Sequence, residues 1–254
     1  MPSVDLNCDV GEDVGADDDV LPFVTSANIA CGMHAGDAGT MRRTVASSLR
    51  HGVALGAHPG FADRAGFGRR EMELPADEIR ELVIDQIGAL AAVARTQGAR
   101  LAHVKPHGAL YNMAATRRAV ADAIAGAVRS VDASLVLFGL AGSELVSAGR
   151  AVGLVVAEEV FADRRYAADA TLVPRSEAGS LITDSPGVIE QALRMVREGR
   201  VRSLSGPDVR VRADTICLHG DTPGAAALAR ALRAALERDG VSVAAPGGTR
   251  MTRA

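Results

Sequence analysis

The feature that most constrains the fold is a regular alternation of short apolar segments with longer amphipathic segments. The apolar segments resemble strands and begin near Val4, Ser26, Val53, Leu101, Ser134, Leu154 and Asp214. The segments between them predict helices over Thr40–Arg50, Pro75–Gln97, Thr116–Ser130, Ser143–Val152, Pro186–Glu198 and Pro223–Asp239. Alternating strands and helices indicate an α/β fold built from βα units around a parallel sheet. About seven units favour a closed or nearly closed (β/α) barrel, and a doubly wound open sheet is the alternative.

The chain is expected to form a single domain over residues 1–254, because no Gly/Ser/Pro-rich linker or low-complexity tract divides it. The segment Phe161–Asp184 is long, polar and interrupted by glycine and proline. A segment of this kind inside a compact domain is typical of a functional loop rather than of a domain boundary.

Composition excludes several classes of protein. The net charge is −3, with acidic and basic residues interspersed, so we expect no nucleic-acid partner. There is no apolar run long enough for a membrane span and no signal-peptide pattern at the N-terminus, so we expect no membrane association and a cytoplasmic location. The three cysteines, Cys8, Cys31 and Cys217, lie in apolar stretches without CxxC spacing, which favours buried thiols over disulfides.

Polar and ionisable residues gather where the predicted strands end. In chain order they are Asn7, Asp9 and Glu12; Asn28, His34 and Asp37; His58; Lys105 and His107; Glu158, Glu159 and Asp163; and His219 and Asp221. In a parallel barrel all of these strand ends open at one mouth, which is where active sites lie. Burying so many titratable groups is costly without a function, so this pattern predicts an active site.

Lys105 is the single lysine among 28 lysine and arginine residues, and it lies at one of these strand ends. A lysine ammonium is a compact charge with a tunable pKa, which arginine cannot replace. We therefore expect a functional role for Lys105, although chance survival in an arginine-rich chain is the alternative.

Common catalytic motifs are absent: the sequence has no P-loop, no HExxH and no GxSxG. Arg69 and Arg70 follow a glycine-rich turn and suit a carboxylate or a phosphate, with plain surface charge as the alternative. The closest histidine pair, His103 and His107, has Lys105 between its members, and an ammonium repels a metal ion. We therefore expect a metal-free or weakly metal-bound site and leave open whether a divalent metal binds.

Seven blocks of sequence resemble the LamB/YcsF family, whose members are the A subunits of prokaryotic 5-oxoprolinase. The blocks are DLNCDVGE (from Asp5), SANIACGMHAGD (from Ser26), GAHPGFADRAGFGRR (from Gly56), HVKPHGALYN (from His103), EVFADRRY (from Glu159), LVPRSEAG (from Leu172) and CLHGDTPGA (from Cys217). They follow the family's order and span almost the whole chain. Two departures are Met33, where phenylalanine is commoner, and Ala170, where glycine is expected. Alanine at 170 would alter the long loop if that position needs a positive φ.

The resemblance implies a deformed barrel of the glycoside hydrolase/deacetylase type. It also implies ATP-dependent cleavage of 5-oxo-L-proline to L-glutamate, with ADP and phosphate as the other products and with subunits B and C as partners. Without a P-loop, the sequence does not decide which subunit binds ATP.

The residues at the predicted mouth offer the roles that such a reaction needs. We expect Asp9 or Glu12 as the base, His58 or His107 as a proton shuttle, and Lys105 beside the developing negative charge. The expected substrate-binding residues are Asn7, Asn28, His34, Asp37, Arg69, Arg70, Tyr111, Glu159, Asp163, Arg164, His219 and Asp221. Two alternatives remain: a metal-dependent amidohydrolase or carbohydrate deacetylase, and a non-catalytic subunit that binds a small acid.

Overall fold

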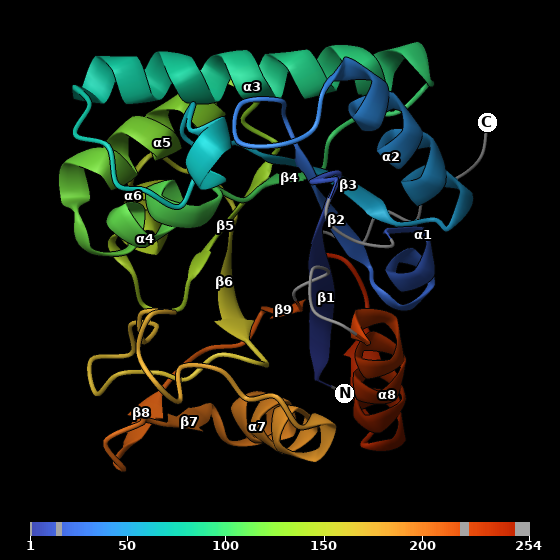
Figure 1. Ribbon diagram of the computed structural model, residues 1–254, viewed down its shortest axis with the longest axis vertical. Helices are drawn as coiled ribbons and strands as arrows, with labels where there is room; N and C mark the ends of the chain where they lie inside the picture. Colours follow the sequence, from blue (N-terminus) through green and yellow to red (C-terminus); the bar gives the residue numbers. More distant parts are fainter. Residues whose placement is uncertain (1, 14–16, 219–223, 247–254) are drawn as a thin grey trace.

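The computed structural model describes residues 2–13, 17–218 and 224–246. Its centre is a ring of parallel strands (Figure 1), in chain order β1 (Ser3–Val10), β2 (Ser26–Ala30), β3 (Ala54–His58), β4 (His103–Val104), β5 (Val136–Leu140), β6 (Val156–Phe161) and β9 (Thr215–Leu218). Each strand pairs with the next, and β9 pairs with both β6 and β1, which closes the barrel. The prediction of about seven parallel strands in a closed barrel is confirmed, and the open-sheet alternative is wrong.

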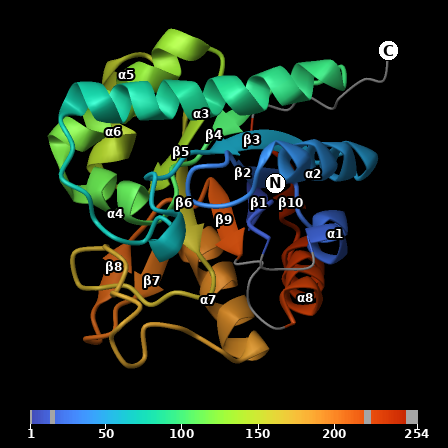
Figure 2. The same cartoon turned by 45° about the horizontal axis from the view of Figure 1, so that its top comes forward.

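Helices follow the strands and surround them (Figure 2). They are α1 (Asp17–Val20), α2 (Ala38–Arg50), α3 (Ala76–Thr96), α4 (Gly108–Thr116), α5 (Arg118–Val131), α6 (Glu144–Ala151), α7 (Ser185–Glu198) and α8 (Ala225–Arg238), with short 3₁₀ turns at Leu21–Phe23 and Arg64–Gly66. Local sequence sets their ends: the Asp184 side chain accepts a hydrogen bond from Gly187 N (2.8 Å) at the start of α7. Gly199 ends that helix in the left-handed conformation, at φ 61°.

Four kinds of element differ from the sequence prediction. The short helices α1 and α4 were not predicted, nor was the antiparallel pair β7 (Arg200–Arg202) and β8 (Asp208–Arg210). The strand β10 (Ser242–Val243) pairs in parallel with the start of β1. β4 is only two residues long, and α4 begins directly after His107.

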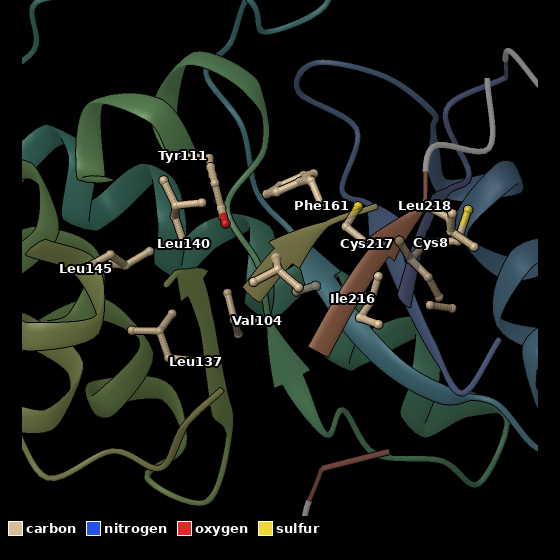
Figure 3. Close-up of a cluster of buried hydrophobic side chains, with 14 of the residues drawn as sticks. Cys8, Val104, Tyr111, Leu137, Leu140, Leu145, Phe161, Ile216, Cys217 and Leu218 are labelled. Carbon is tan, nitrogen blue, oxygen red and sulfur yellow. The ribbon is translucent and has the colours of Figure 1, made fainter. Parts of the chain in front are cut away.

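The barrel strands are buried on both faces, as expected for parallel strands covered by helices. Their outward residues, such as Leu6 and Ile29, belong to one continuous hydrophobic core. Figure 3 shows part of this core, including Val104 of β4, Ile216 of β9 and Phe161 at the end of β6. The three cysteines are free and buried, which confirms the prediction of buried thiols.

The long loop between β6 and α7 is anchored rather than loosely attached. The Tyr166 side chain is fully buried, and its hydroxyl accepts a hydrogen bond from Phe161 N (2.7 Å). The Gln191 amide of α7 donates to the carbonyl oxygens of Phe161, Ala162 and Arg164. Within the described ranges, no helix is long and apolar enough to cross a membrane.

Candidate active site

The inside of the barrel is polar, and its hydrogen bonds join five strands. The Asn7 amide of β1 donates to Glu159 Oε1 of β6 (2.9 Å) and to Thr215 Oγ1 of β9 (2.7 Å). The Asn28 amide of β2 donates to Asn7 Oδ1 (2.7 Å) and accepts from His103 Nε2 of β4 (2.8 Å). Asn7 and Asn28, both predicted to bind substrate, therefore form the floor beneath the site rather than its wall.

His103 and Asp5 complete this floor. The His103 ring stacks on Phe138 at 4.3 Å, and burial lowers the pKa of His103 to about 3, so its ring is neutral. A Cβ on Gly56 would lie 2.0 Å from His103 Nε2, so only glycine leaves room for this ring. The buried Asp5 carboxyl accepts hydrogen bonds from the hydroxyls of three neighbouring residues, and burial raises its pKa to about 6.

The ammonium of Lys105 lies at the centre of the site. Its Nζ is 2.9 Å from Asp9 Oδ1, 3.0 Å from Glu159 Oε1 and 3.0 Å from Cys217 Sγ. Burial opposes the positive charge, but the carboxylates of Asp9 and Glu159 outweigh it and hold the pKa of Lys105 well above its usual value. Lys105 is therefore a fixed cation and acts by electrostatics rather than as a base.

Three histidines lie beside this cation around one carboxylate. His34 Nε2 and His107 Nδ1 are each 3.3 Å from Glu12 Oε1, and His58 Nε2 is 3.8 Å from the same oxygen. His58 Nε2 is also 3.3 Å from Asp9 Oδ2, which links the histidines to Lys105. Glu12 and the three histidines each offer a ligand atom, and those atoms lie within 4.8 Å of one another.

Burial sets the charge of these rings. Burial lowers the pKa of His34 and of His107 to about 3, so both rings are neutral. Burial also disfavours a proton on His58, but the carboxylates of Asp9 and Glu12 outweigh burial and raise its pKa. His58 is consequently the member of the cluster best able to carry a proton.

A cavity of about 490 Å³ opens above this cluster at the carboxyl ends of the strands. Eight predicted site residues line it: Asp9, Glu12, His58, Arg69, Lys105, His107, Tyr111 and Arg164. Tyr111 projects from α4 and packs edge-on against Phe161 at a centroid distance of 5.9 Å (Figure 3). The cavity into which these ionisable groups converge has the size of a site that binds small molecules.

Other predicted site residues lie elsewhere. Asp37 is exposed and caps α2 by accepting from Thr40 N (2.7 Å), and Arg70 is exposed and ion-paired with Asp63. Neither lies among the described residues that line the cavity. Glu159 lies in the floor, His34 stands behind His107, and Asp163 is buried at the start of the long loop. His219 and Asp221 lie outside the described residues.

The long loop contributes residues that the sequence prediction missed. Asp169, Thr171 and Arg175 line the cavity opposite the strand ends, together with Glu71 from the segment before α3. In the sequence, the length and polarity of the loop indicate that it is functional. They do not indicate which of its side chains face the cavity. Arg164 is buried and donates to the carbonyl of Val173 (2.6 Å), which ties the loop to itself beside the cavity.

A closed parallel barrel whose ionisable groups converge on a cavity at the strand ends is the arrangement of a barrel enzyme. A profile of the LamB/YcsF family matches residues 4–250, and the chain belongs to this family.

Similarity to individual relatives extends over nearly the full length. The chain is 59% identical over 249 residues to the A subunit of 5-oxoprolinase from Bordetella pertussis, covering 96% of this chain and 99% of that protein. It is 54% identical over 250 residues to the A subunit of 5-oxoprolinase from Brevibacillus brevis, covering 96% and 98%. The crystal structure of the lactam utilization protein from Thermus thermophilus is 48% identical, with a TM-score of 0.90 and coverage of 96% and 99%.

Proposed function

We propose that this protein is the A subunit of an ATP-dependent 5-oxoprolinase, which cleaves 5-oxo-L-proline to L-glutamate with hydrolysis of ATP to ADP and phosphate. The observation that carries the proposal is the full-length identity of 59% to a protein named as the A subunit of 5-oxoprolinase. Subunits B and C are the proposed partners, and a cytoplasmic location is part of the proposal.

The cavity offers the groups that opening a lactam needs. A lactam is a resonance-stabilised amide, so its carbonyl oxygen must be stabilised as negative charge develops, and its nitrogen must be protonated as it leaves. Lys105 supplies a fixed positive charge at the cavity floor. Asp9 lies between Lys105 and His58, so a proton taken from water by Asp9 has a path to His58.

Glu12 is the second candidate base, because its carboxylate lines the cavity and contacts His107 Nδ1 at 3.3 Å. His58 and His107 are 3.0 Å apart between Nε2 and Nδ1, so one proton can pass between the rings and reach the departing nitrogen. In the proposed reaction the γ-phosphoryl group of ATP passes to the lactam oxygen and ADP leaves. One water then opens the ring to give the amine and an acyl phosphate, and a second water releases phosphate and leaves the carboxylate of glutamate.

Arginines on the cavity wall suit the carboxylate of the substrate. Arg69 lines the cavity and lies over the Phe67 ring at 4.9 Å, whereas the neighbouring Arg70 is tied to Asp63. We therefore assign substrate binding to Arg69 rather than to Arg70. Arg164 and Arg175 line the same cavity and can bind a second anionic group.

The first test is glutamate release from 5-oxoproline by the purified chain, with and without ATP and with and without subunits B and C. We expect release only in the complete mixture with ATP. Lys105→Met in that mixture should lower the rate by about 100-fold or more, because it removes a preorganised charge at the reacting oxygen. Unchanged activity of this variant would contradict the role of Lys105.

Two adjacent arginines provide a matched comparison. Arg69→Gln should raise the KM for 5-oxoproline by about 10-fold or more, because a hydrogen bond to a charged group contributes about 1.5–3 kcal/mol. Arg70→Gln should leave KM within about 3-fold, since Arg70 is exposed, lies outside the cavity lining and loses only its pairing with Asp63. Equal effects of the two substitutions would refute the assignment.

A metal-dependent amidohydrolase is the second candidate, and the convergence of Glu12, His34, His58 and His107 is the observation that favours it. This function predicts hydrolysis of an amide by the chain alone, without ATP. Failure of the complete mixture on 5-oxoproline, together with metal-dependent amide hydrolysis by the isolated chain, would replace the first proposal with this one.

A further inference from the structure

The strongest unexplained feature of the site is the direction of its histidine rings. His58 Nδ1 is 2.8 Å from the carbonyl oxygen of Lys105, and His107 Nε2 is 2.8 Å from the carbonyl oxygen of Phe67. A carbonyl can only accept, so each of these ring nitrogens carries a proton and donates it. The other nitrogen of each ring, His58 Nε2 and His107 Nδ1, therefore presents a lone pair when the ring is neutral.

These two nitrogens lie 3.0 Å apart, and a carboxylate oxygen lies beside both. Two lone pairs and a carboxylate oxygen repel one another unless a proton or a metal cation lies among them. Histidines that bind a metal through one ring nitrogen commonly donate the N–H of the other ring nitrogen to a backbone carbonyl, and this hydrogen bond orients the ring toward the metal.

We propose that Glu12, His58 and His107 hold a divalent transition-metal ion, such as Zn²⁺, in the wall of the cavity. The three donor atoms form a triangle with sides of 3.0, 3.3 and 3.8 Å. Ligand atoms about 2.0–2.1 Å from a tetrahedral zinc lie about 3.3 Å from one another, so the triangle has the size of one face of that shell. All three residues line the cavity, so the remaining position of the ion faces the substrate space. While an ion is bound, His58 Nε2 and His107 Nδ1 hold it and do not pass a proton, and Asp9 beside Lys105 is then the base.

His34 takes a supporting part in this site. Its ring stacks on His107 at 3.8 Å with an interplanar angle of 4°, and its Nε2 is 3.3 Å from Glu12 Oε1. Lone pairs on two parallel stacked rings run side by side and do not converge on one ion. His34 therefore holds Glu12 and braces His107, as a positioning residue behind the ligands.

The surrounding backbone holds this arrangement closely. A Cβ on Gly60 would lie 2.8 Å from His34 Nδ1, and a Cβ on Gly68 would lie 2.9 Å from both His107 Cδ2 and His34 Cβ. Because these glycines permit no larger residue without movement of a ring, the donor atoms are positioned before any ion arrives.

The charge of the site favours a cation despite Lys105. Its ammonium is ion-paired with Asp9 and Glu159, and the Glu12 carboxylate faces the histidines. The carboxylates of Asp9 and Glu159 lie within 3.0 Å of the ammonium and balance its charge at close range. Repulsion by Lys105, the reason for expecting a metal-free site, is thereby offset. Two imidazoles and one carboxylate suit a transition-metal ion rather than Mg²⁺ or Ca²⁺, which prefer oxygen ligands.

The test measures metal binding by the full-length chain and needs no substrate, so it does not depend on the proposed 5-oxoprolinase activity. Chain stripped with a chelator is titrated with Zn²⁺ by calorimetry, and the bound metal is counted after gel filtration. We expect about one Zn²⁺ per chain, with no competition from excess Mg²⁺. Failure to retain Zn²⁺ at micromolar concentration would overturn the proposal and leave a shared proton as the occupant.

Substitutions then locate the ion. Glu12→Gln and His107→Gln should each weaken binding by more than about 100-fold, and His34→Gln by about 10–100-fold, as for residues that orient ligands. The matched control is His51→Gln, because His51 is an exposed histidine at the end of α2. If His51→Gln weakens binding as much as His107→Gln, or if His107→Gln has no effect, the ion does not lie at this cluster. Circular dichroism checks that each variant is folded.

Discussion

The buried ammonium of Lys105 gives the sharpest prediction about stability. The substitution Lys105→Met keeps most of the side-chain volume and removes the charge. It leaves Asp9 Oδ1 and Glu159 Oε1 without the cation that lies 2.9 and 3.0 Å from them. The Glu159 side chain is fully buried, so water cannot replace the lost partner.

The magnitude follows from this burial. Removing one partner of a buried ion pair costs about 3–5 kcal/mol, because the remaining charge stays desolvated. With a urea dependence of about 2–3 kcal/mol per molar, the unfolding midpoint should fall by about 1–2 M. The raised pKa of Lys105 means that its contribution is fully present below about pH 10.4, the unfolded value, and is lost only above it. Urea unfolding at about pH 7.5 therefore measures the whole effect.

A second substitution separates the charge from simple loss of packing. In the background of Lys105→Met, the isosteric change Glu159→Gln removes one of the stranded carboxylates. We expect the double variant to regain at least about 1 kcal/mol relative to Lys105→Met alone, which is a favourable coupling in a double-mutant cycle. A midpoint for Lys105→Met within about 0.2 M of the wild type, or no recovery on adding Glu159→Gln, would refute this account of the barrel floor.

Three further predictions concern the floor and the loop. Gly56→Ala places a methyl 2.0 Å from His103 Nε2 and should lower the free energy of unfolding by about 1–3 kcal/mol, measured in urea. Ala170 has φ 69°, and Ala170→Gly should raise the thermal midpoint slightly, because relief of about 1–2 kcal/mol of left-handed strain exceeds the entropy cost of glycine, about 0.4–1 kcal/mol. The pKa of Asp5 is raised from 3.8 to about 6, so stability should fall as pH rises through this window by about 3 kcal/mol, and Asp5→Asn should remove that fall. The prediction for Asp5 would be contradicted if the stability of the wild type rises between about pH 4 and pH 6 and matches that of Asp5→Asn throughout.

The sequence predicts the barrel because strand and helix periodicities differ, and each segment is long enough to show one of them. The six predicted helices match α2, α3, α5, α6, α7 and α8 within a few residues. The helix α4 has no such signal, since it begins directly after His107 and runs almost without a break into α5. The pair β7 and β8 is only three residues per strand, too short for an alternating pattern to emerge.

The candidate site is predicted well where the backbone is regular and poorly where it is not. Period-two alternation along a strand puts Asn7 and Asp9 on one face of β1, and the structure shows both bonded to Asn28 inside the barrel. The same alternation would put His103 and His107 on one face of a longer strand. β4 ends at Val104, however, so His103 bonds within the floor while His107 turns toward Glu12.

That early end of β4 also decides which histidines meet. His34 and His107 both lie in loops beyond their strands, 73 residues apart in sequence (107 less 34), yet their rings stack at 3.8 Å. No local periodicity relates two loop positions, because each depends on how its loop folds back over the barrel. The expectation of a metal-free site came from the sequence neighbours His103, Lys105 and His107. The proposed metal site comes from residues that the closed barrel brings together in space. Zinc binding by the full chain would support the inference from spatial proximity, and failure to bind zinc would support the expectation based on sequence neighbours.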